Sequence, residues 1–397
     1  MTNAEITALT DQHIMKTYGR LPIAFVKGQG CRLWDADGKK YLDFLAGISV
    51  LGTGHCHPKV VQAICEQAGQ IMHTSNLFQI EPQAKLAKLL CENTCADKAF
   101  FCNSGAEANE AAIKLARKWA GLHLKDGQRT ILTALDSFHG RTLATVTATG
   151  QPKYYKPFAP LPGGFDYVPY NDLEALTARV DDTVCAVMLE PIIAEGGIIV
   201  PSEGYLQGVR KLCDDKGILL ICDEVQTGLG RTGTFMGYQQ FGIEPDIFTL
   251  AKALGGGFPI GACLAKDSVA SAFEPGNHAS TFGGNHLACA AGLAAISVIL
   301  DDDLPGNAKR MGQMVKDGLL AMKSEVPLVA GVRGRGLLLG LELSEPKGTE
   351  VEAGCRERGL IVNKLGDQLL RLAPPLILSE AEVEEALGIM REAMLNA

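Results

Sequence analysis

The sequence predicts an α/β protein: a mostly parallel central sheet with helices on both faces, plus a smaller α+β domain built from both termini. Between about residues 98 and 300, short apolar runs alternate with amphipathic stretches of helical period. The runs are apolar along their whole length, which is typical of parallel strands buried on both faces. Residues 22–45 and the stretch after residue 306 lack this alternation, so we assign them to the smaller domain.

The length of 397 residues exceeds what one small core holds and indicates several subdomains. We expect an N-terminal segment over residues 1–58 that belongs to the small domain. A large α/β domain is expected over residues 59–305, and the rest of the small domain over residues 306–397.

In the large domain, the apolar runs predict strands at 99–103, 130–135, 184–191, 218–225, 247–251 and 260–265. Amphipathic stretches lie between them. One helix is expected to bury a face formed by Tyr205, Leu206, Val209, Leu212 and Cys213.

In the small domain, residues 22–45 predict short antiparallel strands with turns at 27–30 and 37–38. A helix after residue 306 should lead to strands at 336–343, 360–365 and 369–375. Ser379 and Glu382 form a capping-box pattern that opens a last helix. Its expected buried face consists of Val383, Ala386, Leu387, Met390 and Met394.

Composition excludes several classes of function. The net charge of −8, without a basic stripe, argues against nucleic-acid and anionic-membrane partners. The N-terminus has no apolar segment of the signal-peptide kind, and no apolar run is suited to span a bilayer. The twelve cysteines contain no Cys-x-x-Cys pair, so they indicate small buried side chains in a reducing, cytoplasmic compartment. We expect no metal at His55-Cys56-His57, because adjacent residues cannot all face one ion.

Two strand ends carry the main chemical signal. Asp223 and Glu224 follow one buried strand, and Lys252 follows another and precedes Gly255, Gly256 and Gly257. Ligands of open α/β sheets bind at the carboxyl ends of strands. A lysine that can bind a carbonyl covalently and an acid that can hold a ring nitrogen protonated are what pyridoxal 5'-phosphate requires. Gln226 can reach a ring hydroxyl.

Simpler interpretations of the same residues remain open at this point. Lys252 can be a solvated lysine at a strand end, and Asp223 can pair with Arg231. Gly228, Gly230 and Gly233 also form a G-x-G-x-x-G pattern that a nicotinamide oxidoreductase would carry. We reject that pattern because no amphipathic helix follows it, and we interpret the segment as a mobile loop on the substrate side. A module that only binds a phosphorylated ligand is a further alternative.

Three other segments suit a phosphorylated, ring-shaped ligand. Gly105 and Ala106 follow a strand and open a helix, where free backbone amides bind phosphate; a plain Ser104 N-cap is the structural alternative. Ser280 and Thr281 begin a second Gly-rich segment before a helix. Phe138 can stack on a flat ring and Arg141 can grip a carboxylate, although an isolated Phe or Arg is more often a core or surface residue.

Taken together, these segments resemble the class III, or ω-amino, branch of the pyridoxal-phosphate aminotransferases of fold type I. The resemblance covers nearly the whole chain. It comprises GHCHP (54–58), NSGAEANE (103–110), FHGRT (138–142), LEP (189–191), DEVQTGLGRTG (223–233), KALGGG (252–257), STFGGN (280–285) and RLAPP (371–375).

The resemblance implies a role for each matching residue. Lys252 binds the cofactor covalently and then transfers the proton, while Asp223 holds the ring nitrogen. The other cofactor-binding residues are Gly105, Ala106, Phe138, Glu224, Val225, Gln226 and, from the neighbouring subunit, Thr281. The implied assembly is a homodimer with shared active sites.

Within the family, the residues resemble those of members that act on N2-acetyl-L-ornithine in arginine biosynthesis, with 2-oxoglutarate as the amino acceptor. The implied substrate-binding residues are Tyr18, Arg141, Glu195, Ser280 and Arg371. Ile48 replaces a tyrosine typical of ornithine-specific relatives. Ile193-Ala194 replaces the Gln-Gly that is usual in the family as a whole. Succinylornithine, N-succinyl-diaminopimelate, ornithine and 4-aminobutyrate remain alternative donors.

Overall fold

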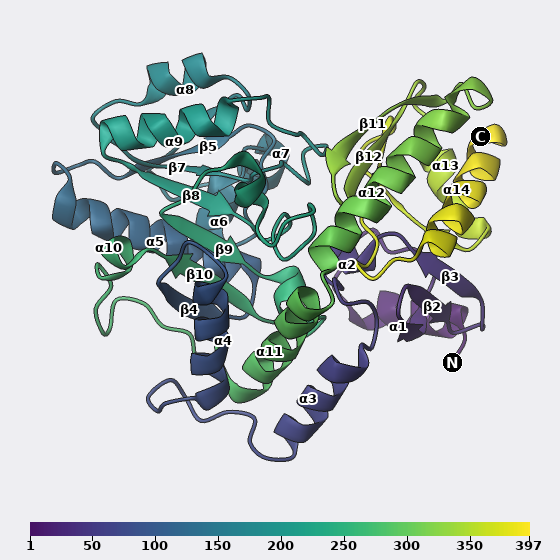
Figure 1. The fold of residues 1–397 in the computed structure, drawn as a ribbon, viewed down its shortest axis with the longest axis horizontal. Helices are drawn as coiled ribbons and strands as arrows, with labels where there is room; N and C mark the ends of the chain where they lie inside the picture. The colour runs from purple at the N-terminus through teal and green to yellow at the C-terminus, as the bar shows by residue number, and fades with distance from the viewer.

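A seven-stranded sheet forms the centre of the larger lobe of the computed structural model, which describes residues 1–397 (Figure 1). Its order is β4-β10-β9-β8-β7-β5-β6. Strands β9, β8, β7, β5 and β6 are parallel, and β10 runs antiparallel to β4 and β9. The bounds are β4 (Lys98–Cys102), β5 (Thr130–Ala134), β6 (Phe165–Val168), β7 (Val184–Leu189), β8 (Leu219–Asp223), β9 (Ile247–Leu250) and β10 (Gly261–Ala265).

Helices cover both faces of this sheet, as predicted. Successive residues of β8 point to opposite sides: Leu219 and Ile221 pack in one apolar cluster, Leu220 and Cys222 in the other. The first cluster includes α5 (Gly105–His123) and α10 (Asp267–Ala270). The second includes α4 (Glu81–Glu92), α8 (Leu173–Arg179), α9 (Tyr205–Lys216) and α11 (His286–Asp301). Short helices α6 (Leu143–Ala148) and α7 (Pro152–Tyr155) follow β5, while α3 (Pro58–Ala68) contacts α11.

The smaller lobe contains segments from both ends of the chain, and both termini lie in it (Figure 1). Strands β1 (Phe25–Gln29), β2 (Arg32–Asp35) and β3 (Lys40–Asp43) are antiparallel, and β13 (Leu360–Ile361) joins β3 in parallel. A second sheet has the order β11-β12-β15-β14. Its strands are β11 (Val329–Arg335), β12 (Leu338–Leu343), β15 (Leu369–Leu372) and β14 (Asn363–Lys364). The domain boundaries at residues 58 and 305 remain a prediction.

One predicted strand of this lobe is wrong. Residues 360–365 do not form a single strand, because β13 and β14 belong to two different sheets. Val362 stands between them, is buried, and marks the point where the chain changes sheets.

The remaining helices are α1 (Asn3–His13), α2 (Ala46–Ser49), α12 (Leu304–Ala321), α13 (Gly348–Glu357) and α14 (Glu380–Leu395). Helix α14 begins with the predicted capping box, in which Ser379 and Glu382 each bond the other's backbone. Its predicted apolar face is buried, except that Leu387 is only half-buried. No helix combines the length and apolar character needed to cross a membrane.

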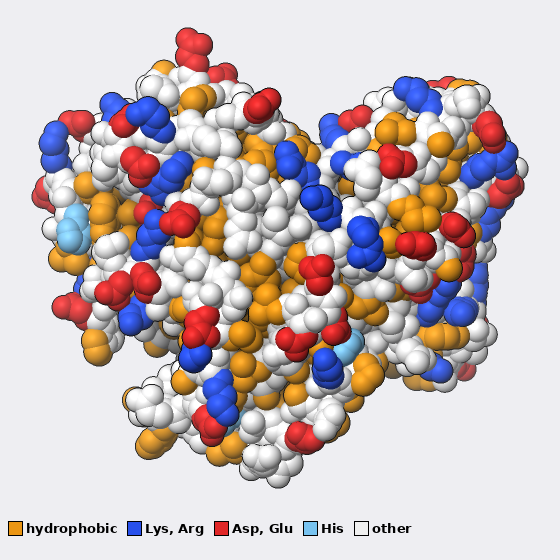
Figure 2. Space-filling model, in the orientation of Figure 1, with side chains coloured by type: hydrophobic (Ala, Val, Ile, Leu, Met, Phe, Trp, Pro, Cys, Tyr) orange, Lys and Arg blue, Asp and Glu red, His pale blue; other side chains and the backbone are white.

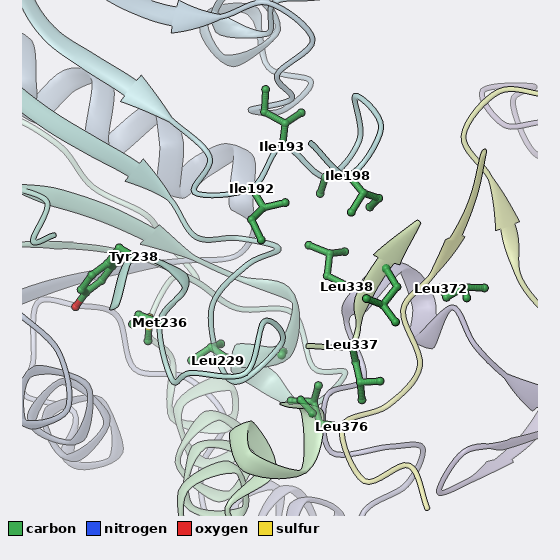
Figure 3. Close-up of a cluster of buried hydrophobic side chains, with 14 of the residues drawn as sticks. Ile192, Ile193, Ile198, Leu229, Met236, Tyr238, Leu337, Leu338, Leu372 and Leu376 are labelled. Carbon is green, nitrogen blue, oxygen red and sulfur yellow. The ribbon is translucent and has the colours of Figure 1, made fainter. Parts of the chain in front are cut away.

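The Gly-rich loop after β8 is a buried connection between the two lobes. We expected a mobile loop on the substrate side, and this was wrong. Leu229 of the loop lies toward Leu337 and Leu376 of the C-terminal part (Figure 3), and Met236 belongs to the same apolar cluster. Arg231 is 2% exposed and donates hydrogen bonds to the carbonyls of Leu337 and Pro374, at 2.9 and 2.5 Å. A short 3-10 turn at residues 237–241 follows, so the helix of a dinucleotide fold is absent.

Candidate active site

One cavity of about 410 Å³ lies at the ends of β4, β8 and β9. A volume of this size suits a small ligand or cofactor. The predicted site residues that line it are Gly105, Ala106, Phe138, Arg141, Asp223, Val225, Gln226 and Lys252. Residues from four different segments therefore meet at the sheet edge that the sequence indicated.

Asp223 is a buried carboxylate with two side-chain donors. Asn109 Nδ2 donates to its Oδ2 at 2.7 Å, and His139 Nδ1 lies 2.8 Å from the same oxygen. Because a carboxylate only accepts hydrogen bonds, His139 carries its proton on Nδ1 here. The alternative pairing of Asp223 with Arg231 is wrong, since Arg231 bonds backbone carbonyls of the C-terminal part.

Lys252 stands two residues after the end of β9 and has a left-handed backbone, with φ of 47°. Such a conformation is strained for a side-chain-bearing residue and is concentrated at functional sites. Burial lowers the pKa of the Lys252 ammonium, and the charge of Glu195 partly counters this shift. A buried lysine with a lowered pKa spends more time as the neutral, nucleophilic amine.

The N-terminus of α5 faces the same cavity. Ser104 is the N-cap, and its hydroxyl accepts from the amide of Glu107 at 3.2 Å, so the structural interpretation of this serine holds. Gly105 and Ala106 line the cavity beyond it. A Cβ atom at Gly105 would lie 2.8 Å from Cγ1 of Val225, so only glycine fits. Free amides at a helix N-terminus form an anion site.

These residues fit pyridoxal phosphate. A lysine, a buried carboxylate and a helix N-terminus line a single cavity, with Phe138 and Val225 beside them. The lysine suits the aldehyde of the cofactor, the carboxylate its ring nitrogen, and the helix N-terminus its phosphate.

Glu195 and Arg371 form an ion pair next to Gln226. Gln226 Nε2 donates to Glu195 Oε1 at 3.1 Å, and Arg371 Nη2 donates to Asn363 Oδ1 at 2.6 Å. Burial alone would raise the pKa of the Glu195 carboxyl, but the charges of Arg371 and Lys252 and the bond from Gln226 hold it below its usual value. Glu195 is therefore a carboxylate at neutral pH.

The predicted site residues that do not line the cavity are Tyr18, Glu195, Glu224, Ser280, Thr281 and Arg371. Glu224 and Tyr18 lie away from it. The side chain of Glu224 points into the loop that follows it. Its carboxylate accepts hydrogen bonds there from the Thr227 hydroxyl and from the amides of Gly237 and Tyr238. Its role is to hold that loop. Tyr18 is 74% exposed, contacts Arg20 and does not line the cavity.

The Ser280-Thr281 segment stands at the edge of the site. Ser280 Oγ accepts from Asn103 Nδ2 at 3.2 Å, and Asn103 lines the cavity. Thr281 is exposed and does not line it. Its assignment to a neighbouring subunit's site remains a prediction. Arg141 is exposed and lies over the Tyr154 ring, 4.0 Å from its centroid.

Glu190, Asn109 and His139 line the cavity but were missed as site residues. The amide of Phe138 donates to Glu190 Oε1 at 2.9 Å, and that of Ala194 donates to Oε2 at 3.1 Å. Glu190 thus joins the Phe138 segment to the loop that carries Glu195. Burial raises its pKa to about 7. The available signal was a polar residue at the end of an apolar stretch, since Glu190 directly follows the apolar strand β7.

The unusual Ile193-Ala194 pair lies in the core. Both side chains are fully buried, and Ile193 packs near Ile192 and Ile198 (Figure 3). Ile48 has a left-handed backbone, is 40% exposed and does not line the cavity, whereas Val50 does.

Known proteins resemble this chain over its full length. The family described as "Aminotransferase class-III" matches residues 14–394. An acetylornithine aminotransferase of Caldanaerobacter subterraneus is 50% identical over 383 residues, covering 96% of this chain and 97% of that protein. One of Gloeobacter violaceus is 52% identical over 381 residues, 96% of this chain and 95% of that protein.

Solved structures give the same result. The ornithine aminotransferase of Toxoplasma gondii superimposes with a TM-score of 0.96 at 35% identity, covering 100% of this chain and 96% of that one. The acetylornithine aminotransferase of Elizabethkingia anophelis gives a TM-score of 0.90 at 32% identity, with 100% of both chains covered.

Proposed function

This chain belongs to the class III aminotransferases, and we propose that it transfers the terminal amine of N2-acetyl-L-ornithine to 2-oxoglutarate. The products are N-acetyl-L-glutamate 5-semialdehyde and L-glutamate, a step of arginine biosynthesis. The main support for this donor is the roughly half-identical, full-length match to acetylornithine aminotransferases.

The enzyme uses pyridoxal phosphate, which when bound supplies a conjugated ring that accepts electrons from the carbon losing its proton. Lys252 Nζ binds the cofactor and moves that proton, helped by the lowered pKa of its amine. Asp223 holds the ring nitrogen protonated, and Asn109 and His139 fix the carboxylate. The α5 N-terminus would hold the phosphate, and Phe138, which lines the same cavity, would contact the ring.

We propose that the Glu195–Arg371 ion pair lets one pocket bind two substrates of different charge in turn. With acetylornithine bound, Glu195 pairs with Arg371 and neutralises its charge. No unpaired arginine then lies beside the side chain of the donor. With 2-oxoglutarate bound, Glu195 moves away and Arg371 grips a carboxylate. The pair's position beside Gln226 supports this arrangement, because Gln226 lines the cavity and bonds Glu195. We assign Arg141 to the α-carboxylate of the donor.

We also assign the active enzyme to a homodimer in which Thr281 of one subunit reaches the phosphate site of the other. Exposure of Thr281 next to Ser280, at the edge of the cavity, supports this. A cytoplasmic location is supported by the cysteines, most of which are buried single thiols.

A half-reaction assay tests the donor. The purified holoenzyme is mixed with N2-acetyl-L-ornithine alone, and conversion of the cofactor to its pyridoxamine form is followed by absorbance. The same experiment with ornithine, succinylornithine and 4-aminobutyrate provides the comparison. We expect the highest second-order rate with acetylornithine. A higher rate with ornithine, succinylornithine or 4-aminobutyrate would refute the assignment.

A further inference from the structure

A second cavity, of about 610 Å³, lies between the two lobes and shares no lining residue with the active site. Its walls are α12, the turn that joins β11 to β12, and residues 232–234 of the loop after β8. The lining consists of polar side chains and glycines, with Val200 as its one hydrophobic residue. Figure 2 shows Lys and Arg side chains gathered where the two lobes meet.

Three cations line this interlobe cavity: Lys309 and Lys316 from α12, and Arg335 at the end of β11. No carboxylate lines it. None of the three cations forms an ion pair within 4.0 Å. By contrast, Arg333 on the same strand pairs with Glu342 at 3.0 Å. In a chain of net charge −8, three unneutralised cations around one polar cavity are a local excess of positive charge.

Two of these cations are held in place. Lys316 Nζ donates to the carbonyl of Gly334 at 2.5 Å. The Arg335 guanidinium lies 5.1 Å from the centre of the Phe241 ring, and its Nη1 donates to Gln240 at 3.4 Å. Burial and the like charge of Arg335 lower the pKa of Lys316, against a smaller opposing effect of Asp317. The cations therefore repel one another, and an anion between them would relieve that repulsion.

Glycines let the walls of the cavity pack closely on one another, since a Cβ atom at Gly336 would lie 2.5 Å from the carbonyl carbon of Thr232. Gly334 and Gly336 have φ of 113° and 53°, and Gly233 packs against Lys309. We propose that the interlobe cavity binds a multivalent oxyanion, namely the pyrophosphate group of a small phosphate-bearing molecule. Lysines act as point charges toward phosphate, and Arg335 adds a planar donor. The volume exceeds that of one phosphate and leaves room for the rest of such a molecule.

An occupied cavity would connect α12 and the β11–β12 turn to the loop that follows Gln226. This site is separate from the catalytic cavity, so the proposal stands independently of the donor assignment. The ligand should stabilise the folded enzyme, because it binds segments from both lobes only when they are folded together.

Inorganic pyrophosphate is the probe. It is titrated calorimetrically into the holoenzyme at low ionic strength, with the cofactor bound so that the catalytic phosphate site is filled. We expect saturable binding that weakens as salt is added and a raised unfolding temperature. K309Q and R335Q should each weaken binding by about tenfold or more, since each removes a charge next to the ligand. R335K should retain part of the affinity.

The matched control is R310Q. Arg310 neighbours Lys309 on α12 but bonds Asn307 and does not line the cavity, so its loss should change affinity less than twofold. Circular dichroism and transaminase activity verify that each variant is folded. An absence of binding at millimolar pyrophosphate would overturn the proposal, as would equal losses in K309Q and R310Q. Citrate binding as tightly as pyrophosphate would overturn its phosphate specificity.

Discussion

At the scale of single residues, the site depends on buried charged side chains, each of which pairs with one or two neighbouring side chains. Asp223 is fixed by Asn109 and His139, and Arg371 is neutralised by Glu195. Because burial makes an unpaired charge costly, removing one partner changes what the other will bind. The ion pair gives the clearest test of this principle.

Replacing Glu195 with alanine should tighten glutamate binding about tenfold or more, because Arg371 is then free to hold a carboxylate through charge-assisted hydrogen bonds. The variant should prefer α-amines and be impaired in the half-reaction with 2-oxoglutarate. Stopped-flow measurement of both half-reactions checks this. Glu203→Ala, which removes an exposed carboxylate, should leave both unchanged. If both half-reactions of Glu195→Ala match those of the parent, the gate is disproved.

Glu224 should make stability depend on pH. Burial raises its pKa to about 7 against an ordinary 4.5, so between these values the folded state keeps a proton that the unfolded chain has released. The contribution of Glu224 to the free energy of unfolding is therefore fully present below pH 4.5 and is lost as the pH rises to 7. The shift corresponds to roughly 3 kcal/mol. Denaturant unfolding at several pH values should show the advantage of the parent over Glu224→Gln shrinking across this window, and parallel curves would contradict the prediction.

At the scale of elements, the start of α5 depends on one glycine. A Cβ atom at Gly105 would lie 2.8 and 3.1 Å from the two methyl carbons of Val225. Since Val225 is β-branched and lines the same cavity, it cannot turn aside without moving into the cofactor's space. The close contact at Gly105 therefore fixes the distance between the N-terminus of α5 and Val225, the residue expected to cover the ring.

Gly105→Ala should weaken pyridoxal phosphate binding by about tenfold, in keeping with overpacking costs of 1–3 kcal/mol. Titration of the apoenzyme with the cofactor, followed by absorbance, measures this. Gly388→Ala is the control, because Gly388 lies inside α14 with no atom near its missing Cβ. There alanine should stabilise the protein by about 0.5–1 kcal/mol. Unchanged cofactor affinity in Gly105→Ala would show that the clash is relieved at no cost.

The elements of the central sheet could be predicted from sequence because their apolar runs are continuous, and Lys252 and Asp223 could be placed because they end such runs. Strand β6 was missed because its residues are mostly half-buried. The division of residues 360–365 between two sheets depends on partners more than 300 residues away in the N-terminal part, since β13 pairs with β3. The orientation of the Glu224 side chain could not be predicted, because a sequence shows that two acids end a strand but not which one turns toward the cavity.

At the scale of the whole molecule, the chain exposes an unusually apolar surface beside its active site. Leu77 is 88% exposed, and Phe78 and Phe282 are mostly exposed as well. Asn76 joins the two segments by donating to the carbonyls of Ser280 and Gly283, at 3.1 and 2.9 Å. Because contiguous exposed apolar patches mark interaction sites, we assign residues 71–78 and 282 to the contact between subunits of the proposed homodimer.

Leu77→Asp combined with Phe282→Asp should therefore dissociate the dimer, because a dimer would bury two carboxylates per subunit without partners. Sedimentation velocity should show a monomer at concentrations where the parent is dimeric, and transaminase activity should fall with it, since Thr281 would no longer reach a second site. Leu122→Asp is the control: Leu122 is also exposed but lies near the far end of α5, and its replacement should leave the dimer intact. A double variant that stays dimeric would place the interface elsewhere. One that becomes monomeric yet keeps full activity would show that each active site is complete within a single chain.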